Sequence, residues 1–411
     1  FRSVSADGGA NAILFDPANG SDGASLSVTG STADGSGGVI RASSGDAVVV
    51  GGGSVSLARM RVEDGAGRAI AADGAASVSL TRVTLSGNGG AGGLPTVDLA
   101  ETTGAVTIMS STLSAGSGDL LRVAASATTP TVTVYQSTFS DGDGAGLLVE
   151  ADADGAVSAT VSGSTFDGLA GPGVRWRAGL SPGADGHSLL TVVSSAFRDR
   201  AGAGGSHLAL ELGASSATTA VLGAAGQPNT FDTVGGTGAA AIQLDVSGGA
   251  VLEATVAAST IDAPRGRGLA LEAAQAADVT LLVDANTIRD AVAEALWAAA
   301  GAGDGDSAVD VTVTANQVSG ANAGAAALAA IAVESAEHTL CADVSGNTVT
   351  ATAGGAFDVV LRAVDPGLLR YAMAGSGTVT DADVVARNTI GAAQVTGAGV
   401  SGSGGAACRL P

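Results

Sequence analysis

The sequence predicts an all-β fold, a right-handed parallel β-helix (solenoid) of about 13–14 coils. Three observations predict this fold class. The 411 residues are 45% hydrophobic but only 3% aromatic, so small and β-branched side chains supply the apolar content, and these suit pleated strands. Segments of alternating apolar and polar residues, such as VSLTRVTL and VTVYQSTF, recur along the chain. Their period of 23 to 41 residues is typical of a solenoid.

The last apolar residue of each STF-like segment marks the repeat. In eleven of twelve coils another apolar residue stands five positions earlier. Because one coil cannot bury its own apolar face, stacked coils must supply the core. The earlier apolar residues are therefore expected to form one internal column, which runs through Leu57, Leu80, Ile108, Val134, Val161 and Val192 and ends with Val385.

Four of the seven phenylalanines occupy the last apolar position of consecutive coils. They are Phe139, Phe166, Phe197 and Phe231. Equivalent positions in stacked strands lie about 4.8 Å apart. We therefore expect these rings to form one internal stack, which Leu and Ile continue at both ends.

Two positions before this row, small polar residues recur. The later coils carry Asn229, Asn286, Asn316, Asn347 and Asn388, and most of the others carry Ser. Stacked Asn side chains can hydrogen-bond to one another and to backbone groups at a turn. We expect a structural polar ladder that points inward or lies at a bend, and a binding row is the alternative.

The residue between these two rows is Thr in nine of twelve coils, as at Thr112, Thr138 and Thr165. This row is expected to face outward. A regular outward Thr array is what an ice-binding face needs, but the uneven coil lengths and the single column favour β-branched residues that fill exposed strand positions.

Composition hardly changes along the chain, and no linker divides it. We therefore expect a single β-helix domain over residues 1–411, with an N-terminal coil or cap at 1–25 and a C-terminal cap at 391–411. The segment RDAVAEALWAAA at 289–300 also suits a short helix.

The formal net charge is −21, and all 18 basic residues are Arg. Without a basic stripe or an aromatic platform, the sequence excludes nucleic-acid binding. No apolar run reaches the roughly 20 residues of a membrane span. Phe1 opens into polar, turn-rich sequence with no signal peptide, which indicates a mature chain or an excised segment.

The STF and NTI coil endings, the outward Thr and the N-terminal stretch AILFDPANGSDGASLSVTG resemble the parallel β-helix domains of large secreted or cell-surface bacterial proteins. These include adhesins and autotransporter passenger regions, whose broader superfamily also contains pectin-degrading enzymes. The resemblance spans residues 12–400 and implies the fold more strongly than an activity.

A surface protein of this kind experiences an oxidising compartment, and the end of a β-helix needs a cap. The resemblance thus implies a disulfide between Cys341 and Cys408, the only two cysteines, that pins the last coils. Two buried free thiols are the alternative.

The motifs of the pectin-degrading relatives are missing. The sequence has no Asp-Asp dipeptide, its NT pairs continue with apolar residues, and its nearest His motif is ADGHS at His187. Arg265 and Arg267 are the nearest basic candidates for a lyase, but they lie in a turn without an obvious carboxylate cluster. The three His and two Cys share no metal-ligand spacing. We expect no catalytic residues, although carboxylates from different coils remain an alternative.

Calcium is the one cofactor that the sequence leaves open. Asp-Gly clusters offer hard oxygen ligands at Asp141, Asp143, Asp152, Asp154, Asp304 and Asp306. None matches a known calcium loop, so solvated turns are the favoured interpretation.

The sequence therefore favours a non-catalytic extracellular structural or adhesive β-helix of a bacterial surface or secreted protein. Its expected partners are a surface ligand, a glycan or neighbouring copies of the chain. The alternative is a polysaccharide-active enzyme, a lyase or a hydrolase, which would need a carboxylate-lined groove and aromatic sugar platforms.

Overall fold

The computed structural model describes residues 1–17, 23–152, 154–179, 181, 186–199, 205–232, 240–301, 307–320, 329–336, 338–350, 357–364, 367–373, 376–404 and 408. Two compact units make up the chain. Unit 1 comprises Phe1–Ala178, Ala184–Thr191 and Ser195–Gly202, and unit 2 comprises Gly179–Gly183, Val192–Ser194 and Ala203–Pro411.

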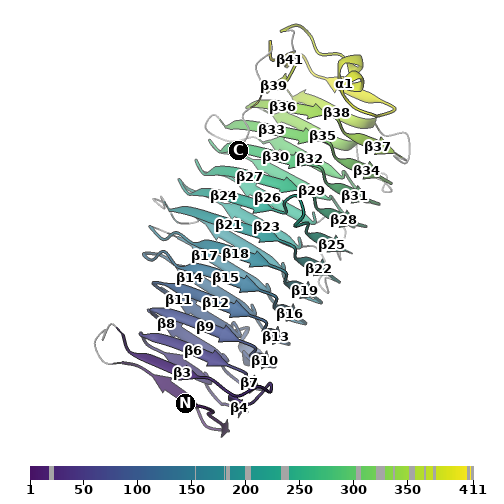
Figure 1. Cartoon of the computed structure of the whole chain (residues 1–411). Helices are drawn as coiled ribbons and strands as arrows, with labels where there is room; N and C mark the ends of the chain where they lie inside the picture. The colour runs from purple at the N-terminus through teal and green to yellow at the C-terminus, as the bar shows by residue number, and fades with distance from the viewer. Residues whose placement is uncertain are drawn as a thin grey trace. The chain divides into compact units, whose positions relative to one another are not determined.

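Both units have the predicted all-β, parallel solenoid fold (Figure 1). Each coil contributes one strand to each of three parallel sheets, called sheets A, B and C below. The described residues contribute 13 strands to sheet A and 14 strands each to sheets B and C.

In unit 1, sheet A contains β1 (Ala6–Asp7), β4 (Gly38–Arg41), β7 (Met60–Glu63), β10 (Thr84–Ser86), β13 (Thr112–Ser114), β16 (Thr138–Ser140), β19 (Thr165–Asp167) and β22 (Ala196–Arg198). Sheet B contains β2 (Ile13–Phe15), β5 (Val48–Val50), β8 (Ile70–Asp73), β11 (Val97–Ala100), β14 (Leu121–Ala125), β17 (Leu147–Ala151) and β20 (Val174–Ala178). Sheet C contains β3 (Ser25–Val28), β6 (Ser54–Ala58), β9 (Ser77–Thr81), β12 (Ala105–Met109), β15 (Thr131–Tyr135), β18 (Ser158–Ser162) and the start of β21 (His187–Val193). A short 3-10 helix, η1, spans Gly90–Gly92.

In unit 2, sheet A contains β25 (Thr230–Asp232), β28 (Thr260–Asp262), β31 (Thr287–Arg289), β34 (Gln317–Ser319) and β37 (Thr348–Thr350). Sheet B contains β23 (Leu208–Leu212), β26 (Ile242–Val246), β29 (Leu269–Ala273), β32 (Leu296–Ala300), β35 (Ala329–Ala336), β38 (Phe357–Val364) and β40 (Ala393–Thr396). Sheet C contains β24 (Ala217–Leu222), β27 (Val251–Ala257), β30 (Asp278–Asp284), β33 (Ala308–Thr314), β36 (Thr339–Ser345), β39 (Leu368–Tyr371) and β41 (Val400–Gly402). The helix α1 spans Asp381–Arg387.

The core lies inside the coils, because alternate residues of each strand point inward. In unit 1, the expected internal column of sheet C pairs Leu57 with Leu80, Leu80 with Ile108, Ile108 with Val134 and Val134 with Val161. Each of these side chains is at most 1% exposed. Val192 is also buried, but it belongs to unit 2.

The last coil differs from the sequence expectation. Val385 does not continue the internal column, because it lies in α1 and is only partly buried. The reason is local. Thr380 caps the helix, its side chain accepts a hydrogen bond from the backbone N–H of Asp383, and the Asp383 side chain bonds back. This capping box favours a helix over a strand.

Strands also occur in the three segments for which the sequence allowed a helix or predicted a cap. The segment 289–300, whose composition also suits a helix, contains β32. The expected N-terminal coil or cap at 1–25 contains β1 and β2, and the expected C-terminal cap at 391–411 contains β40 and β41.

Candidate functional site

The phenylalanine row forms a ring stack inside sheet A of unit 1. The ring centroids of Phe139 and Phe166 are 5.0 Å apart, and those of Phe166 and Phe197 are 4.9 Å apart, with interplanar angles of 13° and 8°. In unit 2, Phe231 is buried and in register with Ile261. The surrounding chain packs tightly against the stack, because a Cβ added to Gly146 would lie only 2.6 Å from the Phe166 ring. The role of the rings is packing.

The Ser members of the polar row hydrogen-bond to the backbone of the coil before them in unit 1. The hydroxyl of Ser137 accepts from the backbone N–H of Ser111, Ser164 accepts from Ser137, and Ser195 accepts from Ser164, at 3.2 to 3.3 Å. Each of these serines is 1 to 2% exposed. The row therefore satisfies backbone donors at the bend between sheets C and A.

The Asn members do the same in unit 2 and also contact one another. The side-chain amide of Asn286 donates to Oδ1 of Asn316 (3.0 Å), Asn316 donates to Asn347 (3.0 Å), and Asn347 donates to Asn388 (2.9 Å). Each Oδ1 also accepts from the backbone N–H of the coil before it. Asn229 donates to the carbonyl of Val192 (2.7 Å).

A left-handed residue precedes the polar row in most coils. Gln136, Ala285 and Ala315 have φ of 48° to 55° without being glycine. This conformation costs a non-glycine residue about 1 kcal/mol, but it turns the chain from sheet C into sheet A and aims the next side chain inward. The polar ladder offsets that cost with its hydrogen bonds.

A row of alternating charges lies on the outer face of sheet B in unit 1. Arg68 pairs with Asp46 (3.2 Å) and Asp98 (3.1 Å), Arg122 pairs with Asp98 (3.0 Å) and Glu150 (2.7 Å), and Arg177 pairs with Glu150 (3.0 Å). Burial alone would lower the pKa of Arg122, but hydrogen bonds and charge from Glu150 and Asp98 raise it. We call this row the ion-pair ladder.

Sequence reasoning missed the ion-pair ladder. Its members stand in different coils and at no fixed offset from the STF position, so no local pattern marks them.

On the same face of sheet B, unit 2 has carboxylates in register instead. Glu211 pairs with Asp245, and Asp245 pairs with Glu272, on consecutive strands. Burial, followed by the negative charges of Glu272 and Glu211, raises the pKa of Asp245 despite a hydrogen bond from Gln243. We call this row the acidic row; it brings carboxylates from three coils into register.

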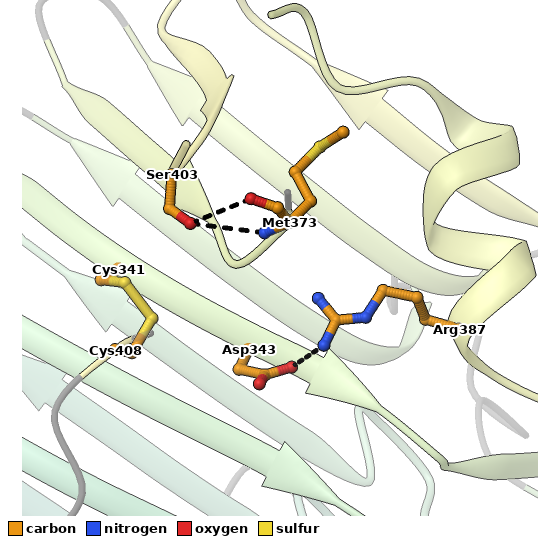
Figure 2. Close-up of a disulfide and its surroundings, with 6 residues drawn as sticks. All are labelled: Cys341, Asp343, Met373, Arg387, Ser403 and Cys408. Carbon is orange, nitrogen blue, oxygen red and sulfur yellow. Dashed lines mark hydrogen bonds and ion pairs between the residues drawn. A yellow bond between two sulfur atoms is a disulfide. The ribbon is translucent and has the colours of Figure 1, made fainter. Parts of the chain in front are cut away.

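The expected disulfide is confirmed, because Cys341 and Cys408 are bonded. Cys341 lies on β36 and Cys408 near the C-terminal end (Figure 2). Nearby, Arg387 of α1 donates to Asp343 (2.7 Å) and lies 5.2 Å from the Tyr371 ring centroid. One carboxylate oxygen of Asp310 and the two sulfurs lie within 4.8 Å of one another, but the sulfurs are bonded to each other and offer no thiolates.

Among the hollows on the described surface are two small ones. One, of about 250 Å³, is lined by Asp34, Arg82, Val83, Thr84, Ser110 and Thr112 in unit 1. The other, of about 220 Å³, lies beside the disulfide in unit 2 and is lined by residues that include Asp310, Thr339, Arg370 and Ser403. Both are smaller than the roughly 300–1,000 Å³ of typical ligand pockets.

The remaining sequence candidates are dispersed. Asp141, Asp143, Asp152 and Asp154 lie in turns, whereas Asp304 and Asp306 lie outside the described residues. Arg267 pairs with Glu294 (2.9 Å) and stacks on Trp297, 4.1 Å from the ring centroid. Arg265 is exposed.

The histidines are separate. His187 is exposed, and His207 is buried with Nε2 3.1 Å from the carbonyl oxygen of Asp232. The Nδ1 of His338 is 3.5 Å from the backbone N–H of Ser307.

In the described part of the chain, no helix is both long and apolar enough to cross a membrane. No protein-family model, no curated protein and no solved structure matches this chain.

Proposed function

We propose that this chain is a non-catalytic structural or adhesive β-solenoid of an extracellular or cell-surface protein. The disulfide carries the proposal, because such bonds persist mainly in oxidising compartments. The coil endings, which resemble those of bacterial adhesins and autotransporter passengers within the pectin-lyase-like fold, support the same assignment.

The chemistry of the recurrent residues supports a structural role. The Phe row is packed, the Ser and Asn rows bond to neighbouring coils, and the Arg and carboxylate side chains of the ion-pair ladder neutralise one another. The residues that repeat from coil to coil thus hold the coils together. Recognition of a surface ligand, a glycan or another copy falls to the variable turns and the outer faces.

The experiment is a paired binding and cleavage screen of the purified chain. Acidic and neutral polysaccharides are tested, with and without Ca²⁺, for retention of the chain and for depolymerisation. Retention without cleavage, at a level above that of the heat-unfolded chain, is the expected result. Reproducible depolymerisation would overturn the non-catalytic assignment.

The acidic row favours a second candidate, a polysaccharide-active hydrolase or lyase. Asp245 has a raised pKa and stands between two carboxylates, and a raised pKa suits a general acid. If cleavage occurs, Asp245→Asn should abolish it, while Asp98→Asn in the ion-pair ladder should leave it unchanged. Equal activity of both variants would exclude this row as the catalytic centre.

A further inference from the structure

The outer face of sheet C in unit 1 carries hydroxyl groups in two adjacent columns. The first column holds hydroxyls at Ser25, Ser54, Ser77, Thr131 and Ser158 and is interrupted by Ala105, and the second holds Ser27, Ser56, Ser79, Thr107, Thr133 and Thr160. All are exposed or half-buried. They belong to β3, β6, β9, β12, β15 and β18, which follow one another in Figure 1. We call these two columns the hydroxyl face.

The strands of the hydroxyl face pair without a shift in register. Ser27 pairs with Ser56, Ser56 with Ser79, Ser79 with Thr107, Thr107 with Thr133 and Thr133 with Thr160. The uneven coil lengths therefore do not disturb this face, because insertions fall in the turns. Its side chains repeat at about 4.8 Å across strands and about 6.6 Å along them.

The hydroxyl face is uncharged, although the other faces of the same coils are not. A third column beside it holds Ala58, Thr81, Met109, Tyr135 and Ser162, which are also uncharged. Sheet B of unit 1 carries the ion-pair ladder, and sheet A carries Arg61 and Glu63. Charge is thus kept off one face in a chain with a net charge of −21.

A ligand that matches the hydroxyl face should therefore present an uncharged surface with a repeat in two dimensions. A Ser or Thr hydroxyl both donates and accepts a hydrogen bond, as a water molecule does, and neighbouring hydroxyls can bond along a column, as Ser77 does to Ser54 at 2.9 Å. Charged groups would instead hold strongly bound water that is costly to displace. A rigid array of weak sites gains affinity by multivalency.

We propose that the hydroxyl face of unit 1 binds the ordered water lattice at the surface of ice. The outward Thr column of sheet A, at Thr112, Thr138 and Thr165, has beside it a second outward column that runs from Ser114 and Ser140 into the charged Asp167, whereas both columns of sheet C are uncharged. This activity is independent of the structural or adhesive role proposed above.

The test measures partition of the full chain into slowly growing ice and inhibition of ice recrystallisation. The native chain is expected to enter ice and to inhibit recrystallisation, and the heat-unfolded chain is expected to do neither. The double variant Thr107→Lys and Thr133→Lys should lose both activities. The matched control Thr112→Lys and Thr138→Lys places the same charges on sheet A of the same coils and should keep them.

A second variant, Ser56→Arg with Ser79→Arg, tests the same face on different coils if the first fails to fold, as judged by circular dichroism. Absence of activity in the folded native chain would overturn the proposal. Loss in the sheet A variant alone would also overturn it, by assigning ice to the Thr column. Adsorption to insoluble neutral polysaccharide but not to ice would identify a glycan surface instead.

Discussion

Asn316 illustrates how single buried residues hold coils together. Its side chain is 1% exposed, donates to the carbonyl of Val283 and to Oδ1 of Asn347, and accepts from the backbone N–H of Asn286. One side chain thus satisfies two backbone groups of the preceding coil and bonds to a side chain of the next coil. Such groups cost about 1–3 kcal/mol each when they are buried without a partner.

We therefore expect Asn316→Leu to lower the free energy of unfolding by about 3 kcal/mol, because it leaves Asn286 N–H and the Val283 carbonyl unpartnered. Chemical denaturation followed by circular dichroism measures the change. Gln317→Ala, at the exposed neighbouring position, is the control and should change stability little. Similar losses in both variants would contradict a specific role of the ladder.

Asp245 belongs to the acidic row of unit 2, where unit 1 has the ion-pair ladder. Its folded pKa is raised, chiefly by burial and then by Glu272 and Glu211. A raised carboxyl pKa means that the folded state binds protons more readily than the unfolded state. Stability from this group therefore falls as pH rises from its unfolded value near 3.8 through the raised folded value.

Asp245→Asn removes that charge and should stabilise the chain at neutral pH. Its advantage should shrink as the pH falls and vanish below the unfolded pKa, because the native carboxyl is then neutral too. Melting temperatures measured from pH 3 to 8 check this. In the opposite sense, Asp98→Asn should destabilise the chain near neutral pH, because it removes two ion pairs with Arg68 and Arg122.

At the scale of the element, the local sequence predicted the strands and their buried positions, but it did not predict which side chains line up on the outer faces of the sheets. The five-residue spacing survives in the register of Leu57, Leu80 and Ile108, because strand alternation forces every coil to bury the same positions. The hydroxyl face and the acidic row depend on which coils become neighbours. Equivalent residues there are 23 or more positions apart, so no local window contains them.

The helix α1 shows where the repeat misled the sequence interpretation. Aligning Asn388 with the Asn row was useful, since Asn388 accepts from Asn347. The same alignment placed Val385 on a strand, although Thr380 and Asp383 carried the signature of a helix start. Local capping thus overrode the repeat in this coil.

The capping box of α1 gives a test at this scale. Thr380→Ala removes the side chain that accepts from Asp383 N–H and should cost about 1 kcal/mol of helix stability. Hydrogen bonds from Thr380 lower the pKa of Asp383, so the part of the cap that uses the ionised carboxylate exists above the unfolded pKa near 3.8 and is lost as the pH falls through the folded value.

Hydrogen exchange of the amides of α1 measures the effect of Thr380→Ala. Faster exchange is expected near neutral pH, and Thr396→Ala on β40 serves as the control. Unchanged exchange in α1 would show that Val384, which is fully buried, alone holds the helix in place.

For the whole molecule, a solenoid distributes its stability because each coil contacts only its neighbours. A covalent link should therefore stabilise mainly the coils next to it, even when it joins residues that are far apart in the sequence. The disulfide joins residues 67 positions apart, so it restricts a large loop of the unfolded chain. The chain-entropy model assigns about 4 kcal/mol to a loop of that length.

Reduction of the disulfide should therefore loosen the end of unit 2 and leave unit 1 intact. We expect amides of β36, β39 and β41 to exchange faster after treatment with a reductant, while those of β6, β9 and β12 keep their protection, because nearest-neighbour coupling does not carry the loss along many coils. Hydrogen exchange with mass spectrometry resolves both regions in one sample. A double variant, Cys341→Ser with Cys408→Ser, must show the loosened pattern without reductant and no further response to it. Equal loosening in β6, β9 and β12 would mean that the chain unfolds as one cooperative body and that the disulfide stabilises all of it.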